Sequence, residues 1–360
     1  MSQIQQGLRR SKDASVYHWI QHEDWPQHLF TSNMKRIPTV VRLDSNTPTG
    51  GTKSDPYAGT AFMKIMEAHG SFLDGPENGI SDEDQEICEK LLARDNDTPQ
   101  DTLFVACTFG YVQNRLAARN ETGVMTLIHQ LLIPSAEIEI LRGNVAFRAL
   151  IDCFNEPWTG SVSFCNETHP EHPLPTPQPD YSVGFSRNAF TKIQLDKLKP
   201  FLGKGQTSGF KGTMAMLFPF FTSEAKSGKG NLQEADHHNI HSMTRALKGV
   251  VELFRISGRE KELHRRILGF SISYNHRHAT AFAHYPVFGA DGEVTLHRYE
   301  VEEFSIAKRS LSERWGSYKF VMAIYNDWVP AHFDFLSSAV GDLPDNVDWE
   351  VRSPTPPASV

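Results

Sequence analysis

Apolar residues along the chain predict a series of helices from residue 120 onward. The first helix is marked by apolar positions that repeat every three or four residues: Val124, Leu127, Ile128 and Leu131. Pro134 ends this pattern because proline cannot continue a helix. Further helices are expected over residues 145–154 and 194–202, and a long one over residues 231–256 presents its apolar residues on one face.

Short apolar runs predict strands between these helices. One strand begins at Asp180, after a proline-rich stretch at residues 173–179 that must be extended. A second covers residues 213–221 and leads into Glu224, and two more, at 267–274 and 279–288, are joined by a turn. A last helix carries Trp315, Tyr318, Met322, Tyr325 and Trp328. The order helix, strand, strand, strand, helix, strand predicts an α/β fold with a mixed central sheet and helices on both faces.

The remaining segments suggest a division of the chain. Residues 1–60 are polar and rich in Ser, Thr, Pro and Gly, which predicts a flexible segment. Residues 61–119 are expected to form a helical region packed on the core, and residues 120–340 the α/β domain. Residues 341–360 form a Pro-rich tail.

Composition narrows the class of protein. The chain has 360 residues, 39% hydrophobic and 22% charged, which is typical of a globular protein. No apolar run approaches the ~20 residues of a membrane span, and the polar N-terminus lacks a secretory signal. With only four cysteines, we expect an intracellular protein, cytoplasmic or nuclear, that is not secreted and has no membrane partner. The net charge of −7 argues against a protein that coats nucleic acid but leaves a nuclease open.

The most informative chemistry lies where the second strand ends. Glu224 and Lys226 are two residues apart, so on a strand they project from the same face, while Ala225 points the other way. Asp180 opens another strand and is the expected second acid. The two carboxylates and the Ala225 carbonyl would bind Mg²⁺ or Mn²⁺. Lys226 would orient an attacking water. Glu121, at the start of a helix, is a further candidate acid.

Together these residues resemble the PD-(D/E)XK signature of the restriction-endonuclease-like nucleases. The likeness is closer to an uncharacterised fungal protein family thought to carry that fold. It extends over about residues 120–335 and is carried by Asn120 and Glu121, IPSAE at 133–137, PDYSVGF at 179–185, FPFFTSEAK at 218–226, residues 241–254 and HYPV at 284–287.

The resemblance implies a restriction-endonuclease-like core with an N-terminal helical or irregular extension. It implies a Mg²⁺-dependent hydrolase of phosphodiester bonds in DNA or RNA, in which Asp180 and Glu224 bind the metal and Lys226 orients water. Glu121 occupies the position of a helix-borne catalytic glutamate. A homodimer is compatible with this class.

The sequence departs from the resembled pattern at two places. Asp180 and Glu224 are unusually far apart, which requires an inserted segment between their strands. The long helix carries His237, His238 and Asn239 where a glutamine is expected. A nuclease fold that has lost catalysis and acts as a binding module is therefore the alternative.

Other polar clusters leave further alternatives open. Residues 245–266 could form a basic face for phosphates through Arg245, Lys248, Arg259 and Arg265, or simply a solvated helix end. Two clusters could hold zinc and serve an unrelated hydrolase: the first is His237, His238 and His241, and the second is Cys153, Cys165, His169 and His172. His276 and His278 are expected on a solvent-facing turn.

Overall fold

The structure is a computed structural model of the chain. It describes residues 57, 60–77, 79–100, 102–104, 106–161, 175–202, 207–228, 230–290, 292–307 and 310–344. Contacts divide the chain into two units, residues 1–53 and 54–360, and everything described here belongs to the second unit. Most of the predicted flexible segment (1–60) and of the Pro-rich tail (341–360) lies outside the described residues.

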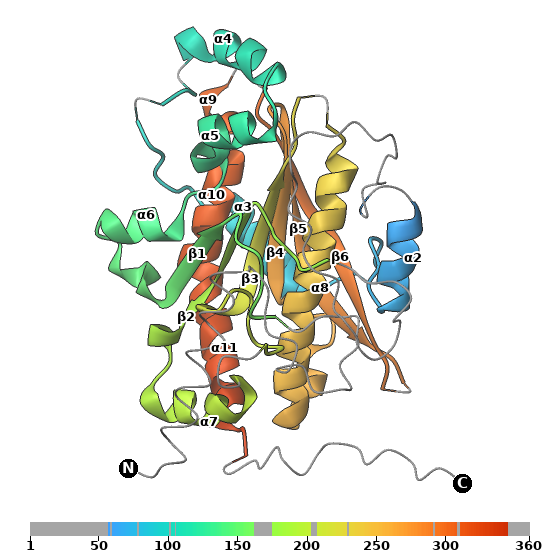
Figure 1. Ribbon diagram of the computed structural model, residues 1–360. Coiled ribbons are helices and arrows are strands. Elements are labelled where there is room, and N and C mark those ends of the chain that lie inside the picture. Colours follow the sequence, from blue (N-terminus) through green and yellow to red (C-terminus); the bar gives the residue numbers. More distant parts are fainter. Residues whose placement is uncertain are drawn as a thin grey trace, which may run out of the picture. The chain divides into compact units, whose positions relative to one another are not determined.

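In the described part of the chain, six strands form one sheet in the order β1 to β6 (Figure 1). The strands are β1 (Leu150–Phe154), β2 (Tyr181–Ser186), β3 (Met216–Ala225), β4 (Gly269–Tyr274), β5 (His278–Phe288) and β6 (Val294–Ser305). β3 and β4 pair in parallel, whereas the other neighbours pair antiparallel. The long helix α8 (Leu232–Ile256) makes the crossover that parallel strands require. The predicted mixed α/β fold is confirmed.

The helices ahead of the sheet are α2 (Thr60–Ala68), α3 (Asp82–Ala93), α4 (Ala106–Ala117), α5 (Glu121–Leu132) and α6 (Ala136–Leu141). Helix α7 (Lys192–Leu202) occupies the insertion between β2 and β3. After β6 come α9 (Leu311–Arg314), α10 (Gly316–Ala323), a π-helical turn at Ile324–Trp328, and α11 (Val329–Gly341). No helix in these described segments is long and apolar enough to cross a membrane.

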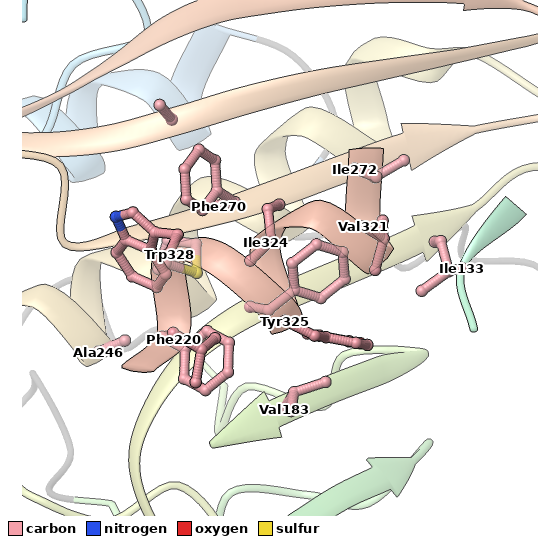
Figure 2. Packing of buried hydrophobic residues seen from close by; sticks show 14 of the residues in the cluster. Ile133, Val183, Phe220, Ala246, Phe270, Ile272, Val321, Ile324, Tyr325 and Trp328 are labelled. Carbon is pink, nitrogen blue, oxygen red and sulfur yellow. The ribbon is translucent and has the colours of Figure 1, made fainter. Parts of the chain in front are cut away.

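Two helical layers cover opposite faces of the central strands. Trp328 packs against Phe220 of β3 and Phe270 of β4, with ring centroids 5.8 and 5.0 Å apart (Figure 2). The other face of β4 carries Ser273, which bonds to Asn239 of α8. Because side chains alternate across a strand, α8 and the closing helices lie on different sides of the sheet.

The α8 face of the sheet is polar where it meets the helix. Thr222 Oγ1 donates to Asn239 Oδ1 at 2.7 Å. Asn239 Nδ2 donates to the Ile272 carbonyl at 3.2 Å and to Ser273 Oγ at 3.0 Å. Asn239 is buried, so these bonds are shielded from water. They fix the register of α8 on both β3 and β4, close to the ends of these strands.

The prediction of a helix over residues 145–154 is wrong. Residues Val145–Ala149 form a short 3₁₀ turn, and Leu150–Phe154 form β1, which pairs with β2 from Leu150 opposite Phe185. Five residues are too few for the spacing of hydrophobic side chains to distinguish a strand from a helix. Pairing with β2 therefore determines that this segment is a strand. Strand β6 was not predicted from the sequence pattern.

Helix α8 passes so close to the loop before β3 that only glycine fits at one position. A Cβ on Gly249 would lie 2.1 Å from the carbonyl oxygen of Gly209. We predict that Gly249→Ala lowers the free energy of unfolding by about 1–3 kcal/mol, because the backbone must move apart. Urea denaturation of the full chain measures this.

The matched control is Gly110→Ala in α4, where an added Cβ meets nothing within 4 Å. There alanine should be neutral or should stabilise by up to ~1 kcal/mol, because it is the better helix former. Equal stability of Gly249→Ala and wild type would contradict the close helix approach.

Candidate active site

The register of β2 on β3 brings the two predicted acids together. Tyr181 lies opposite Ser223, so Asp180, one residue before β2, lies beside Glu224 near the end of β3. Asp180 Oδ2 accepts a hydrogen bond of 2.8 Å from the backbone N–H of Ala225. The acids are distant in sequence, and α7 lies in the insertion between their strands.

Glu224 is almost completely enclosed. It is 4% exposed, and its Oε1 has no hydrogen-bond partner among the described residues. Its Oε2 lies 3.8 Å from Nδ1 of His238. Burial raises the pKa of Glu224 well above its ordinary value, and the neighbouring Asp180 raises it further, against the opposing effects of Lys226 and the Asp180 backbone N–H.

Asp180 shares this environment. Burial raises its pKa, the Ala225 N–H opposes that shift, and Glu121 adds to it. Two neighbouring carboxyls whose pKa values are both raised cannot easily be ionised together. A proton or an added cation relieves this repulsion.

Lys226 and Glu121 lie at the outer side of the acid pair. Lys226 Nζ is 3.2 Å from Glu121 Oε1, and the side chain of Glu121 is about half exposed. Glu121 begins α5, where Asn120 Oδ1 caps the helix by accepting the N–H of Gly123. The structure thus gathers Asp180, Glu224, Lys226 and Glu121, all predicted from sequence, into one cluster.

A cavity of about 690 Å³ opens beside this cluster. Its lining combines the end of α4, the start of α5 and the loop after β3: Asn114, Ala117, Ala118, Arg119, Asn120, Glu121, Thr122 and Ser227. Glu121 forms part of the wall, and Ser227 follows Lys226 in sequence. Of the four clustered residues, Glu121 lines this space, whereas Lys226, Asp180 and Glu224 do not.

A buried Tyr–His pair supports the cluster and was not predicted. Tyr274 lies opposite Ala225 in the parallel ladder, and its hydroxyl is 2.9 Å from Nδ1 of His129 on α5. The carbonyl of Tyr274 accepts the backbone N–H of Lys226 at 2.8 Å. Since His129 is two helical turns from Glu121, the helical period on α5 is the signal that could have indicated it.

The four predicted phosphate-binding residues are not gathered at this site. Arg259 pairs with Glu262 and Asp342, and Arg265 donates to the carbonyls of Gly79 and Ile80. Arg245 is buried and donates to Ser161, whereas Lys248 is exposed on α8. In Figure 1 the C-terminal end of α8 and the N-terminal end of α5 lie at different ends of the sheet.

The proposed zinc ligands have other surroundings. His237 Nδ1 lies 2.8 Å from the Tyr57 carbonyl oxygen, and His241 Nδ1 lies 3.1 Å from the Tyr57 hydroxyl. Cys153 is buried, and burial is the main cause that raises the pKa of its thiol to about 12. Cys165, His169 and His172 lie outside the described residues. Within the described ranges, no group of three or more His, Cys, Asp or Glu side chains is placed to hold a metal ion.

The prediction that His276 and His278 face solvent is wrong for His276. His276 is 6% exposed, and its carbonyl accepts a hydrogen bond from Gln113 Nε2 on α4. Contact with α4 covers a turn that sequence alone marks as exposed. His278 is half-buried at the start of β5, with Nδ1 2.9 Å from Glu303.

The fold and this cluster define a mixed α/β protein with an acidic site where β2 begins and β3 ends. The chain belongs to a family defined by a domain of unknown function, DUF7924, which matches residues 108–340. That match includes every strand of the sheet and the whole acid cluster. Comparisons with curated proteins and with solved structures gave no match.

The raised pKa of Glu224 predicts how stability depends on pH without added metal. A carboxyl whose pKa is higher in the folded protein favours the folded state when it is protonated. Stability should therefore fall as the pH rises from the ordinary value of 4.5 through the higher folded value. Glu224→Gln should remove the part of this stability loss that comes from Glu224, because a glutamine side chain cannot ionise.

Thermal melts of the metal-free protein at about pH 5 and about pH 8 test this linkage. Asp196→Asn, an exposed change on α7, is the control and should follow the wild type. An equal decrease in melting temperature between the two pH values in wild type and Glu224→Gln would contradict a raised pKa for Glu224.

Proposed function

We propose that this protein is a metal-dependent nuclease-like hydrolase of nucleic-acid phosphodiester bonds, built on a restriction-endonuclease-like core. The order of elements supports this proposal. Helix α5, the antiparallel strands β1 to β3, helix α8 and the parallel strand β4 follow one another along the chain, and β1 lies where the sequence pattern predicted a helix. Asp180 and Glu224 occupy the strand ends where the resembled signature has its acids.

The observation that carries the proposal is the buried oxygen of Glu224. Oε1 is enclosed beside a second carboxyl, without a hydrogen-bond partner among the described residues. Leaving a buried charge unpaired is costly, and proteins normally avoid it. A hard divalent cation such as Mg²⁺ or Mn²⁺ prefers carboxylate oxygens and would satisfy both acids. Within the described residues this is a pair of carboxylates and not a group of three or more His, Cys, Asp or Glu side chains, so the proposed site relies on a backbone carbonyl as well.

Asp180 and Glu224 would hold the cation, with the Ala225 carbonyl as a third oxygen. When bound, such a cation supplies an acidified water and positive charge beside a phosphoryl group. Lys226 is held at the edge of the cluster by Glu121, 3.2 Å away. From there its amine would orient the attacking water and face the negative charge that develops on the phosphate.

Nucleic acid, DNA or RNA, would approach through the cavity beside Glu121. That cavity offers Arg119, Asn120 and Ser227 to a passing backbone. Arg119 is exposed there, so it can contact phosphate without breaking a buried contact. The sequence-predicted basic residues Arg259 and Arg265 have partners elsewhere, which moves the proposed phosphate contacts to this side of the molecule.

A second candidate is a nuclease-fold protein without catalysis that acts as a binding module. Asp180 Oδ2 is used to hold the backbone of Ala225, and Glu224 is 4% exposed. Both acids could thus serve as structural groups that tie β2 to β3. In that case the protein would bind no divalent cation here, and acid-to-amide variants would retain function.

Cleavage assays on the full chain test the first candidate. We predict Mg²⁺- or Mn²⁺-dependent cutting of single- or double-stranded DNA or RNA, lost by on the order of a hundredfold or more in Asp180→Asn, Glu224→Gln and Lys226→Gln. Matched controls are Asp196→Asn and Lys199→Gln on the exposed surface of α7, which should cut like wild type.

Melting curves of each variant confirm that loss of cutting is not loss of folding. Absence of cutting by wild type across these four substrates, or full activity in Glu224→Gln, would refute the enzymatic proposal and favour the binding module.

A further inference from the structure

His238 of α8 faces the carboxylate that the proposed chemistry depends on. Its Nδ1 lies 3.8 Å from Glu224 Oε2, and its side chain is about one-quarter exposed. That distance exceeds a direct hydrogen bond and suits an electrostatic contact or one bridged by water. The contact is on Oε2, whereas Oε1 of the same carboxylate has no hydrogen-bond partner among the described residues.

Two neighbours hold the imidazole of His238 in place. The ring of Tyr57 stacks on it, with centroids 3.8 Å apart and planes inclined by 24°. The next residue, Asn239, bonds to both β3 and β4 and fixes the height of α8 on the sheet. The backbone of His238 is therefore set by the sheet and its ring by Tyr57.

Tyr57 is itself held along the same helix. Its carbonyl oxygen lies 2.8 Å from His237 Nδ1 and its hydroxyl 3.1 Å from His241 Nδ1. It also belongs to a small apolar cluster with Phe62 and Met66 of α2 and Ile240 of α8. The tyrosine ring is thus a rigid wall for His238 rather than a mobile surface side chain.

We propose that His238 is a positioning residue: held by Tyr57, it orients Glu224 so that Oε1 is presented to a divalent cation. This inference rests on the proposed function. A partner on one oxygen of a liganding carboxylate restricts its rotation and directs the other oxygen, as groups around metal ligands commonly do.

The test is calorimetric titration of Mn²⁺ into the full chain, which reads cation binding without requiring cleavage. His238→Ala should weaken Mn²⁺ binding by about 10- to 100-fold, the usual effect of removing such an outer partner. His238→Gln should restore most of the affinity, because its amide supplies a polar group at the same position.

Variants of Tyr57 separate the effect of ring stacking on Mn²⁺ binding from the effect of the tyrosine hydroxyl. Tyr57→Phe keeps the ring and should bind Mn²⁺ like wild type, whereas Tyr57→Leu loses the stack and should weaken binding. His297→Ala is the matched control, because His297 also stacks on an aromatic ring, Phe72, but lies on β6. It should leave Mn²⁺ binding unchanged. Melting curves in chelator verify that each variant is folded.

The outcomes distinguish this inference from the proposed function. If wild type binds no Mn²⁺, both are overturned. If wild type binds and Glu224→Gln does not, but folded His238→Ala binds within about twofold of wild type, only the role of His238 is overturned. An affinity for His238→Gln as low as that of His238→Ala would likewise refute positioning by a polar contact.

Discussion

The structure depends on the buried carboxylate of Glu224, whose Oε1 has no hydrogen-bond partner among the described residues. Asp180 ties the start of β2 to the end of β3 through the Ala225 N–H, and this brings its charge beside Glu224 in a region almost closed to water. Burial is the main cause that raises the pKa of both acids, and the charge of Asp180 raises the pKa of Glu224 further. Shifted pKa values of this kind occur at functional sites and also in structural ion-pair networks.

The surrounding fold holds the strands that carry these two acids in place. Asn239 joins α8 to β3 and β4 with buried hydrogen bonds, and Trp328 packs the opposite face of the same strands. The central strands β3 and β4 are therefore packed on both faces. Lys226 pairs with Glu121, and Oε1 of Glu224 is left without a hydrogen-bond partner among the described residues. Rigid elements that hold an unsatisfied polar group are what a binding site for a small ion requires.

Part of the acid cluster could be predicted from local rules, whereas the positions of Asp180 and Glu121 were expected from the resemblance to the nuclease signature. The two-residue period puts Glu224 and Lys226 on one face, and two strand ends meet wherever antiparallel strands pair. The contact between Tyr57 and His238 could not be predicted, since it joins segments far apart in the chain through tertiary packing. Likewise, counting charges indicated a basic face at Arg259 and Arg265, but only the fold shows that their partners lie within the protein.

The most direct test of this account is anomalous diffraction from crystals of the full chain soaked in Mn²⁺. We predict a peak between the carboxylates of Asp180 and Glu224, with Oε1 of Glu224 as a ligand. Crystals with saturating Mn²⁺ and no peak at these two side chains would contradict it, because the buried acids would then be held by the fold alone.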